Sequence, residues 1–356
     1  MRTNLSPFNA ARPFYHQADE KSRTFCNFFL RFLRQFAILA LIKEVIALKR
    51  WTALILLVLM LFGCAPQEQM TQEYVFCMDT VMDLTVWGPD ADAAVKEMTA
   101  LLYELERTWS ATDEKSLISA KNRGEEITDP EALALLDAVD ALSERTGGAF
   151  DPTLYAITQA WGFPTDEFQI PTDAELAEAM AQDVWDLGAA VKGYAGYRLA
   201  ELLEGYGVDR AMLNLGGNVQ TYGEKPDGSP WVIAIQNPDL AADHLGLLSV
   251  TGTMAVVTSG DYQRYFEQDG VRYHHILDPE TGRPADSGLR SVTVICRDGL
   301  TADALSTALF VMGLEEAVEF WRQSDDFEAV FVTTEGKIYA TAGAKLTDCT
   351  FEVIDR

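Results

Sequence analysis

The sequence SVTVICRDGLTADALSTALFVM, residues 291–312, places a strand signal directly before a helix signal. Ser291–Cys296 is dominated by β-branched residues, which favour an extended chain. Ala302–Met312 has apolar residues at helical spacing and stops before Gly313, as helices often do at glycine. The stretch therefore predicts a strand that is followed at once by a helix.

The flanking sequence extends this pattern into a fold class. Helical spacing predominates early and strand signals late, an order that predicts an α+β fold rather than regular βαβ alternation. Further helices are expected at Ala93–Leu105, Pro130–Leu142, Lys192–Glu204 and Glu315–Arg322. Further strands are expected at Asp83–Trp87, Ala211–Leu215, Trp231–Gln236, Met254–Thr258, Tyr273–Leu277, Ala329–Thr333 and Lys337–Ala340. Nothing between residues 74 and 356 resembles a linker, so we expect a single compact unit.

Two helix starts carry explicit cap signals. Asp129 is expected as an N-cap with Pro130 at the first helical position, and Gly147 as the stop of the same helix. Thr172 and Glu175 have the spacing of a capping box.

Composition excludes several classes of protein. The chain has 356 residues, of which 48% are apolar and 23% charged, with a net charge of −26. These values are typical of a globular chain with a sizeable core and argue against a nucleic-acid binder, which needs clustered Lys and Arg. The five cysteines form no CxxC pair, so neither a zinc site nor a dense disulfide framework is predicted.

Residues 1–63 are expected to be a targeting segment. Lys49 and Arg50 precede an apolar run, Trp51–Phe62, that is too short for a comfortable membrane span and has the flanks of a signal peptide. Leu61, Gly63 and Cys64 resemble a bacterial lipobox, in which the cysteine is lipidated. An uncleaved membrane anchor is the alternative. Either reading places the body outside the cytoplasm, anchored at the cell membrane.

The first 45 residues do not fit a signal peptide. They include a second apolar stretch, Phe28–Leu48, which basic residues and Glu44 interrupt, and no Met lies between Met1 and Met60. A misassigned start codon near Val45 or Leu48 is one reading, and a genuine amphipathic extension is the other. Residues 64–73 are polar and are expected to form a tether, with the catalytic domain at 74–356.

Small and polar residues gather at several predicted strand and helix ends. Gly147–Thr153, Asp186–Gly193, Asn214–Asn218 and Thr258–Tyr262 are such clusters. Each is also what an ordinary turn looks like. Lys192 at the start of a helix could supply positive charge to a phosphate. The common nucleotide motifs GxxxxGK[ST] and GxGxxG are absent, as is HExxH.

Two further clusters carry groups able to act chemically. His274 and His275 precede Asp278 and a turn; strand alternation turns one ring inward and the other outward, and a single histidine is more often structural than catalytic. Asp303 and Thr307 share a helix face with Ser306 nearby. These oxygen donors suit Mg²⁺, although a carboxylate offsetting the helix dipole would have the same sequence.

Together and in this order, the clusters resemble the ApbE family, the FAD:protein FMN transferases. Cys77–Thr80 resembles the opening Met-Gly-Thr of the family, with Asp79 in place of Gly. The remaining matches are Ser116, Ile118 and Asn122, Gly148–Thr153, Asp186–Gly188 with Lys192 and Gly193, Asn214–Gly217, Thr258–Gly260, His275–Pro279 with Thr281 and Gly282, and Ala302–Leu305 with Thr307.

The resemblance implies a T-fold-like architecture with a mainly antiparallel sheet and packed helices. It also implies a reaction: FMN passes from FAD to a Thr or Ser hydroxyl of a target flavoprotein, with Mg²⁺ as cofactor, and AMP leaves. The implied partners are flavin-carrying subunits of membrane redox complexes or exported flavin reductases, besides FAD itself and the membrane.

The resemblance also implies roles for individual residues. Asp303 and Thr307 would hold Mg²⁺ with the Ala189 carbonyl and Ser306, and His275 would act on the acceptor or leaving-group proton, oriented by Asp278. The implied flavin-nucleotide contacts are Met78, Ala149, Phe150, Asp151, Asp186, Lys192 and Ile276.

One departure from the family pattern keeps other functions open. The family often has an aromatic residue two positions after Ser110, able to cover the isoalloxazine ring, and this chain has Thr112. Trp109 could substitute for that ring. An FAD pyrophosphatase that gives free FMN and AMP is therefore an alternative, and a lipoprotein that only binds FAD is another.

Overall fold

The computed structural model describes residues 69–239 and 244–356, together with Arg31, Arg34, Gln35, Lys43 and Lys49. Its contacts divide the chain into two units, Met1–Gln67 and Glu68–Arg356. All elements discussed below belong to the second unit. Apart from those five residues, the expected signal segment, Cys64 and the first part of the tether lie outside the described residues. Among the residues that are described, no helix has the length and apolarity needed to cross a bilayer.

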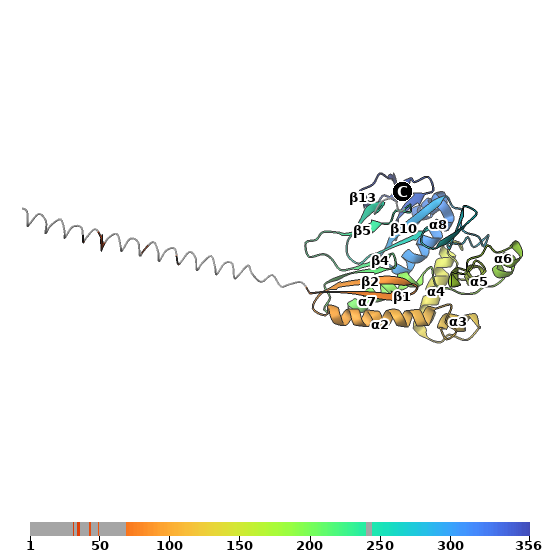
Figure 1. Cartoon of the computed structure of the whole chain (residues 1–356), viewed down its shortest axis with the longest axis horizontal. Coiled ribbons are helices and arrows are strands. Elements are labelled where there is room, and N and C mark those ends of the chain that lie inside the picture. The colour runs from red at the N-terminus through yellow and green to blue at the C-terminus, as the bar shows by residue number, and fades with distance from the viewer. Residues whose placement is uncertain (1–30, 32–33, 36–42, 44–48, 50–68, 240–243) are drawn as a thin grey trace, which may run out of the picture. The chain divides into compact units, whose positions relative to one another are not determined.

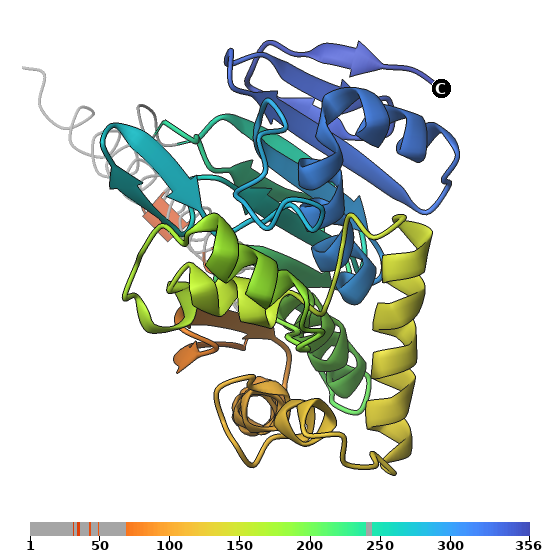
Figure 2. The same ribbon diagram turned by 90° about the vertical axis from the view of Figure 1, so that its right-hand side faces the viewer.

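Helices and strands follow one another largely as the sequence predicts (Figures 1 and 2). The helices are α2 (Ala91–Trp109), α3 (Leu117–Asn122), α4 (Pro130–Arg145), α5 (Tyr155–Ala160), α6 (Asp173–Met180), α7 (Val191–Leu203) and α8 (Gly299–Arg322), with a 3-10 turn η1 (Phe163–Thr165). The strands are β1 (Met70–Cys77), β2 (Thr80–Trp87), β3 (Arg210–Leu215), β4 (Asn218–Tyr222), β5 (Trp231–Ile235), β6 (Gly246–Val250), β7 (Ala255–Gly260), β8 (Tyr265–Gln268), β9 (Val271–His274), β10 (Leu289–Cys296), β11 (Phe327–Thr333), β12 (Ile338–Thr341), β13 (Lys345–Thr347) and β14 (Glu352–Ile354).

The strands form one large sheet and two small ones. The large sheet has the order β1-β2-β3-β4-β7-β10-β11-β12-β14, and only its last pair, β12 with β14, is parallel. A three-stranded sheet, β13-β6-β5, and the hairpin β8-β9 complete the set. The α+β class and the mainly antiparallel sheet are therefore confirmed.

Around β7 and β10 the large sheet has two covered faces. Val257 of β7 and Val294 of β10 lie in the apolar core with α8. Their chain neighbours Val256 and Ile295 lie in the core beneath the three-stranded sheet. Because successive strand residues point to opposite faces, helices cover one side of the sheet and strands β5, β6 and β13 the other. A third core joins β1–β3 to α2, α4 and α7.

The predicted helix signals are confirmed. Asp129 caps α4 by accepting a hydrogen bond from the Ala132 N–H, and Thr172 and Glu175 form the capping box of α6. α8 is interrupted at Gly313, whose φ of 77° breaks it into the two predicted helices. Cys77, Cys296 and Cys349 are free thiols, which settles the open question of a disulfide among them.

Two predicted boundaries are wrong. β1 begins at Met70, inside the expected tether, because all eight of its residues pair with β2. The strand expected at Tyr273–Leu277 ends at His274, since its partner β8 begins opposite it at Tyr265.

Candidate functional site

Asp303 lies where helices α7 and α8 cross. It is 4% exposed, and its Oδ2 accepts a hydrogen bond from the backbone N–H of Gly193 at 2.8 Å. A Cβ atom on Gly193 would stand 2.0 Å from the carbonyl oxygen of Gly299 and 2.6 Å from the Cβ of Asp303. The glycine therefore permits a close helix crossing that holds the carboxylate against the start of α7.

Replacing Gly193 with alanine is expected to destabilise the domain by about 2–3 kcal/mol, because α7 and α8 must separate to admit the methyl group. That corresponds to a melting temperature lowered by roughly 5–10 °C, measurable by calorimetry. Gly205→Ala is the control, since a Cβ there would meet only the Leu202 carbonyl oxygen, at 3.4 Å. Equal melting temperatures of the two variants would contradict this account of the crossing.

A chain of hydroxyl groups continues from Asp303. The Ser306 hydroxyl donates to the Asp303 carbonyl oxygen at 2.8 Å, and its Oγ lies 2.8 Å from Oγ of Ser259 on β7. Ser259 Oγ also lies 3.2 Å from Oγ1 of Thr307. The structure thus brings together the predicted Asp303, Ser306 and Thr307. It adds Ser259, which the sequence showed only as part of a polar cluster at a strand end.

The Ala189 carbonyl, one turn before Gly193, lacks its usual helical donor. In a regular helix the Gly193 N–H would bond to this oxygen four residues earlier. Here that N–H bonds to Asp303, and no other backbone amide in the described chain donates to the Ala189 oxygen. A carboxylate, hydroxyls and a freed carbonyl are hard oxygen ligands, so the donor set fits Mg²⁺. The described residues contain no group of three or more His, Cys, Asp or Glu side chains placed to hold a metal ion, so a metal here would depend on the hydroxyl and carbonyl oxygens as well as on Asp303.

Two charged side chains, Asp186 and Lys192, both bond to Gly188, next to this donor set. Asp186 Oδ1 accepts from the Gly188 N–H at 2.9 Å, and Lys192 Nζ donates to the Gly188 carbonyl at 3.4 Å. Burial raises the pKa of Asp186, while the Gly188 N–H and the charge of Lys192 act to lower it.

The predicted clusters around residues 151 and 186 meet in space. The Asp186 N–H donates to the Pro152 carbonyl at 2.7 Å. Asp151 Oδ1 accepts from both the N–H and the hydroxyl of Thr153, at 2.8 and 2.7 Å. Asp151 directly precedes Pro152, so the hydrogen bond from the Asp186 N–H to Pro152 places Asp151 close to Asp186.

His275 has its ring held by a backbone carbonyl. Its Nδ1 lies 3.1 Å from the Arg264 carbonyl oxygen. Because a carbonyl only accepts, Nδ1 carries the proton and Nε2 of the neutral ring has a free lone pair. Burial lowers the pKa of His275 to about 4, and the charge of Lys192 acts in the same direction. His275 is thus neutral at neutral pH, and its Nε2 lone pair is available to a proton.

The strand alternation expected to turn one histidine inward and the other outward does not extend to His275, because β9 ends at His274. His274 is 8% exposed and packs edge-on against Phe310, with ring centroids 5.5 Å apart. The expectation that Asp278 orients His275 is wrong, because the Asp278 carboxylate accepts from the Glu280 N–H and the Thr281 hydroxyl of its own turn.

Two further predicted positions lie in tight turns at one end of the large sheet. Met78 and Asp79 form the β1–β2 turn with φ of 52° and 57°, a region that Asp tolerates in place of Gly. Gly216 and Gly217 form the β3–β4 turn, and a Cβ on Gly216 would stand 2.5 Å from the Thr80 side chain. The two turns therefore pack against each other.

Several expected flavin contacts have side chains that belong to the core. Phe150 is 2% and Ile276 3% exposed, so their side chains present almost no surface to a ligand. Met78 and Ala149 are half-buried. Trp109 is 5% exposed within the α2 core, whereas Thr112 is exposed, so the idea that Trp109 replaces the missing aromatic cover is wrong.

Asn122 positions the segment before Asp186. Its Nδ2 donates to the Trp185 carbonyl at 3.0 Å, and its Oδ1 accepts from the Trp185 N–H at 2.8 Å. Lys121 Nζ lies 4.0 Å from the centroid of the Trp185 ring. Sequence reasoning placed Asn122 in a motif without finding its partner, which lies 63 residues away.

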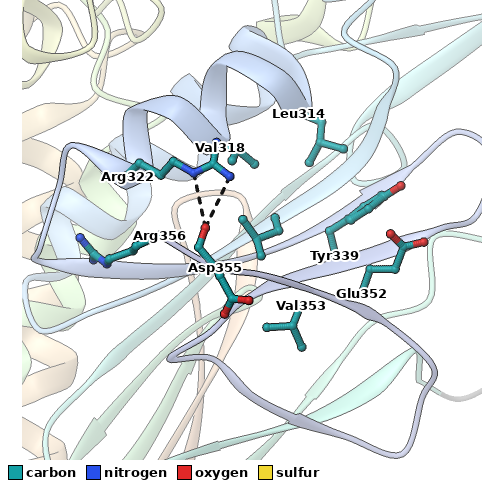
Figure 3. A pocket seen from close by; sticks show the side chains of 9 residues that line it. Leu314, Val318, Arg322, Tyr339, Glu352, Val353, Asp355 and Arg356 are labelled. Carbon is teal, nitrogen blue, oxygen red and sulfur yellow. Dashed lines mark hydrogen bonds between the residues drawn. The ribbon is translucent and has the colours of Figure 1, made fainter.

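A hollow of about 500 Å³ lies elsewhere, between α8 and β14 (Figure 3). Arg322 and Tyr339 line it, and the Arg322 guanidinium donates to the Asp355 carbonyl at 3.4 Å. None of the predicted site residues lines this hollow.

Comparison with known proteins agrees with the resemblance. The model of the ApbE family matches residues 78–331. The FAD:protein FMN transferase of Treponema pallidum is 31% identical over 292 residues, which are 71% of this chain and 81% of that protein. The enzyme of the same name from Vibrio cholerae is 30% identical over 300 residues, which are 76% of this chain and 90% of that protein.

Solved structures give the same result. The ApbE protein of Thermotoga maritima superposes with a TM-score of 0.70 at 32% identity, covering 76% of this chain and 96% of that one. The flavinyl transferase ApbE of Pseudomonas stutzeri superposes with a TM-score of 0.68 at 30% identity, covering 78% and 96%.

Proposed function

The chain belongs to the ApbE family, and on that premise we propose that it is an FAD:protein FMN transferase. A Thr or Ser hydroxyl of a target flavoprotein attacks the FMN phosphorus of FAD. The bond from that phosphorus to the bridging diphosphate oxygen breaks, a phosphoester to the protein forms, and AMP leaves. Phosphoryl transfer depends mainly on positioning and on neutralising charge.

The observation that carries the proposal is the buried Asp303 among hydroxyl groups, beside Lys192 and Asp186. Mg²⁺ held by Asp303, Thr307, Ser306 and the Ala189 carbonyl would polarise the diphosphate. Lys192 adds positive charge for the phosphates. His275, with Nε2 unprotonated, accepts the proton of the incoming hydroxyl.

The test uses the full chain, FAD, Mg²⁺ and a candidate acceptor domain with an accessible threonine. Intact-mass spectrometry follows the acceptor while chromatography follows AMP and free FMN. The proposal expects one FMN per acceptor with an equal amount of AMP. AMP with equal free FMN, for each of several acceptors, would instead establish the pyrophosphatase.

That second function has one observation in its favour. Thr112 is exposed where the family often has an aromatic residue, and Trp109 is buried in the core, so neither covers a flavin ring. An uncovered site admits water more readily as the acceptor. A protein that only binds FAD is less favoured, because it would have no need for the Asp303 arrangement.

We also propose that the protein is exported and lipid-anchored through Cys64, which places it near membrane redox complexes and exported flavin reductases. Mass spectrometry of the N-terminal peptide from membranes should find a lipidated Cys64. Cys64→Ser should abolish that modification and release the protein from the membrane. An unmodified Cys64 in a membrane-bound wild-type chain would favour an uncleaved anchor.

A further inference from the structure

β1 is an edge strand of the large sheet. Within the described residues it pairs only with β2, over eight residues and without a bulge. Its sequence, MTQEYVFC, contains no Pro and no Lys, the residues that commonly protect such edges. An edge of this kind can accept a further strand.

The register shows which backbone groups point outward. Cys77 and Thr80 flank a two-residue turn, so they form the closing hydrogen-bonded pair of the hairpin. From that pair on, hydrogen-bonded and non-hydrogen-bonded residue pairs alternate along β1 and β2. The N–H and C=O groups of Phe76, Tyr74 and Gln72 therefore face away from β2 and are available to another strand.

The edge leads directly to the candidate site. It ends at the Met78 turn, whose N–H bonds to Glu106 Oε1 at 2.7 Å. That turn packs on Gly216 of the β3–β4 turn, and β4 pairs with β7, whose last residues include Ser259 of the candidate site. A segment running along β1 thus reaches the end of the sheet where the proposed chemistry takes place.

The side chains beside this edge are apolar and uncovered on one face. Tyr74 is 65%, Phe76 66% and Val81 60% exposed, while Val75 and Cys77 are buried on the α2 side. The stretch from Met70 to Asp83 carries Glu73, Asp79 and Asp83 and no Lys or Arg. The surface therefore suits an extended segment with apolar and basic residues.

We propose that β1 binds the acceptor protein by strand addition. An extended, threonine-bearing segment with flanking basic residues pairs with the outward edge of β1, which directs its hydroxyl toward the site. The inference rests on the proposed function, because only a protein acceptor needs a docking strand, and it names the surface that this acceptor uses.

The decisive comparison is Tyr74→Pro with Tyr74→Ala, using an acceptor that the wild-type enzyme flavinylates. Proline removes the outward N–H and leaves the β1–β2 bonds intact, whereas alanine removes only the side chain. We expect Tyr74→Pro to lower kcat/KM for the acceptor by at least about tenfold and Tyr74→Ala by less than about threefold, with FAD affinity unchanged. Equal effects of the two variants would overturn strand addition while leaving the proposed function standing.

Hydrogen exchange of the wild-type chain gives a test that no folding defect can obscure. Saturating acceptor should slow exchange of the Tyr74 and Phe76 amides, and unchanged exchange across residues 70–77 would overturn the proposal. Raising the salt concentration should lower kcat/KM for the acceptor, and a salt-independent value would contradict the charge match. Absence of transfer to any acceptor by the wild-type enzyme would instead count against the proposed function itself.

Discussion

Replacing Asp303 with alanine is expected to abolish FMN transfer, with a loss of kcat/KM of at least about 10³-fold. Asp303 is the only carboxylate in the proposed donor set, so its removal takes away the charge that would hold Mg²⁺ against the diphosphate. A 10³-fold loss corresponds to about 4 kcal/mol of transition-state stabilisation. The rate is measured from flavin fluorescence of the acceptor, and metal binding separately from the electron paramagnetic resonance of Mn²⁺.

Asp303→Asn separates the loss of negative charge from the loss of the hydrogen bond that holds the helix crossing. The amide oxygen can still accept the Gly193 N–H bond, so the crossing of α7 and α8 is kept while the negative charge is lost. Both variants should fail to bind Mn²⁺, and the asparagine variant should melt close to the wild type. Full transfer by either variant in Mg²⁺ buffer would remove the assignment of Asp303 to the metal.

Local signals made the longer helices predictable from the sequence, whereas the six-residue helices α3 and α5 were not predicted. Asp129 and Pro130 start α4, Thr172 and Glu175 start α6, and Gly313 interrupts α8. Each signal acts within one helical turn, so a reader of the sequence needs no knowledge of the rest of the fold. The same holds for the spacing of Asp303 and Thr307 on one helix face.

The short strands lacked such signals. β4, β8, β13 and β14 are three to five residues long, and their stability comes from neighbours distant in sequence. β13, for example, pairs with β6, whose residues lie about 98 positions earlier. β1 was overlooked because its polar first half, Met70–Glu73, looked like a tether, and its register with β2 is what makes it a strand.

In the candidate site, too, arrangements within one helix were predictable and arrangements between distant segments were not. Sequence reasoning placed Asp303, Ser306 and Thr307 together because they lie on one helix. It missed Ser259, which joins them only through the packing of β7 on α8. It also assigned Asp278 to His275 because the two are close in sequence, although the carbonyl that holds the ring belongs to Arg264, on another segment.

Replacing His275 with glutamine is expected to lower kcat for FMN transfer by about 10²–10⁴-fold, the usual contribution of a general base. FAD affinity should change little, because the ring is held by the Arg264 carbonyl and its proposed role is to take the hydroxyl proton. His274→Gln is the control: it alters the neighbouring buried histidine, which packs on Phe310, and should leave kcat near the wild-type value. Equal kcat values for the two variants would contradict a role for His275 in proton transfer.

The pH dependence gives this role a second signature. A base acts only when unprotonated, and the pKa of His275 is lowered to about 4, so kcat/KM should stay flat from neutral pH downward and fall only as the pH approaches 4. In the proposed complex with FAD, an anionic diphosphate near the ring would favour the imidazolium and raise the pKa of His275. The acid limb of kcat should therefore lie at higher pH than the limb of kcat/KM, and both limbs should disappear in His275→Gln. A variant that kept the wild-type acid limbs would show that another group titrates, and His275 would then be a positioning residue at most.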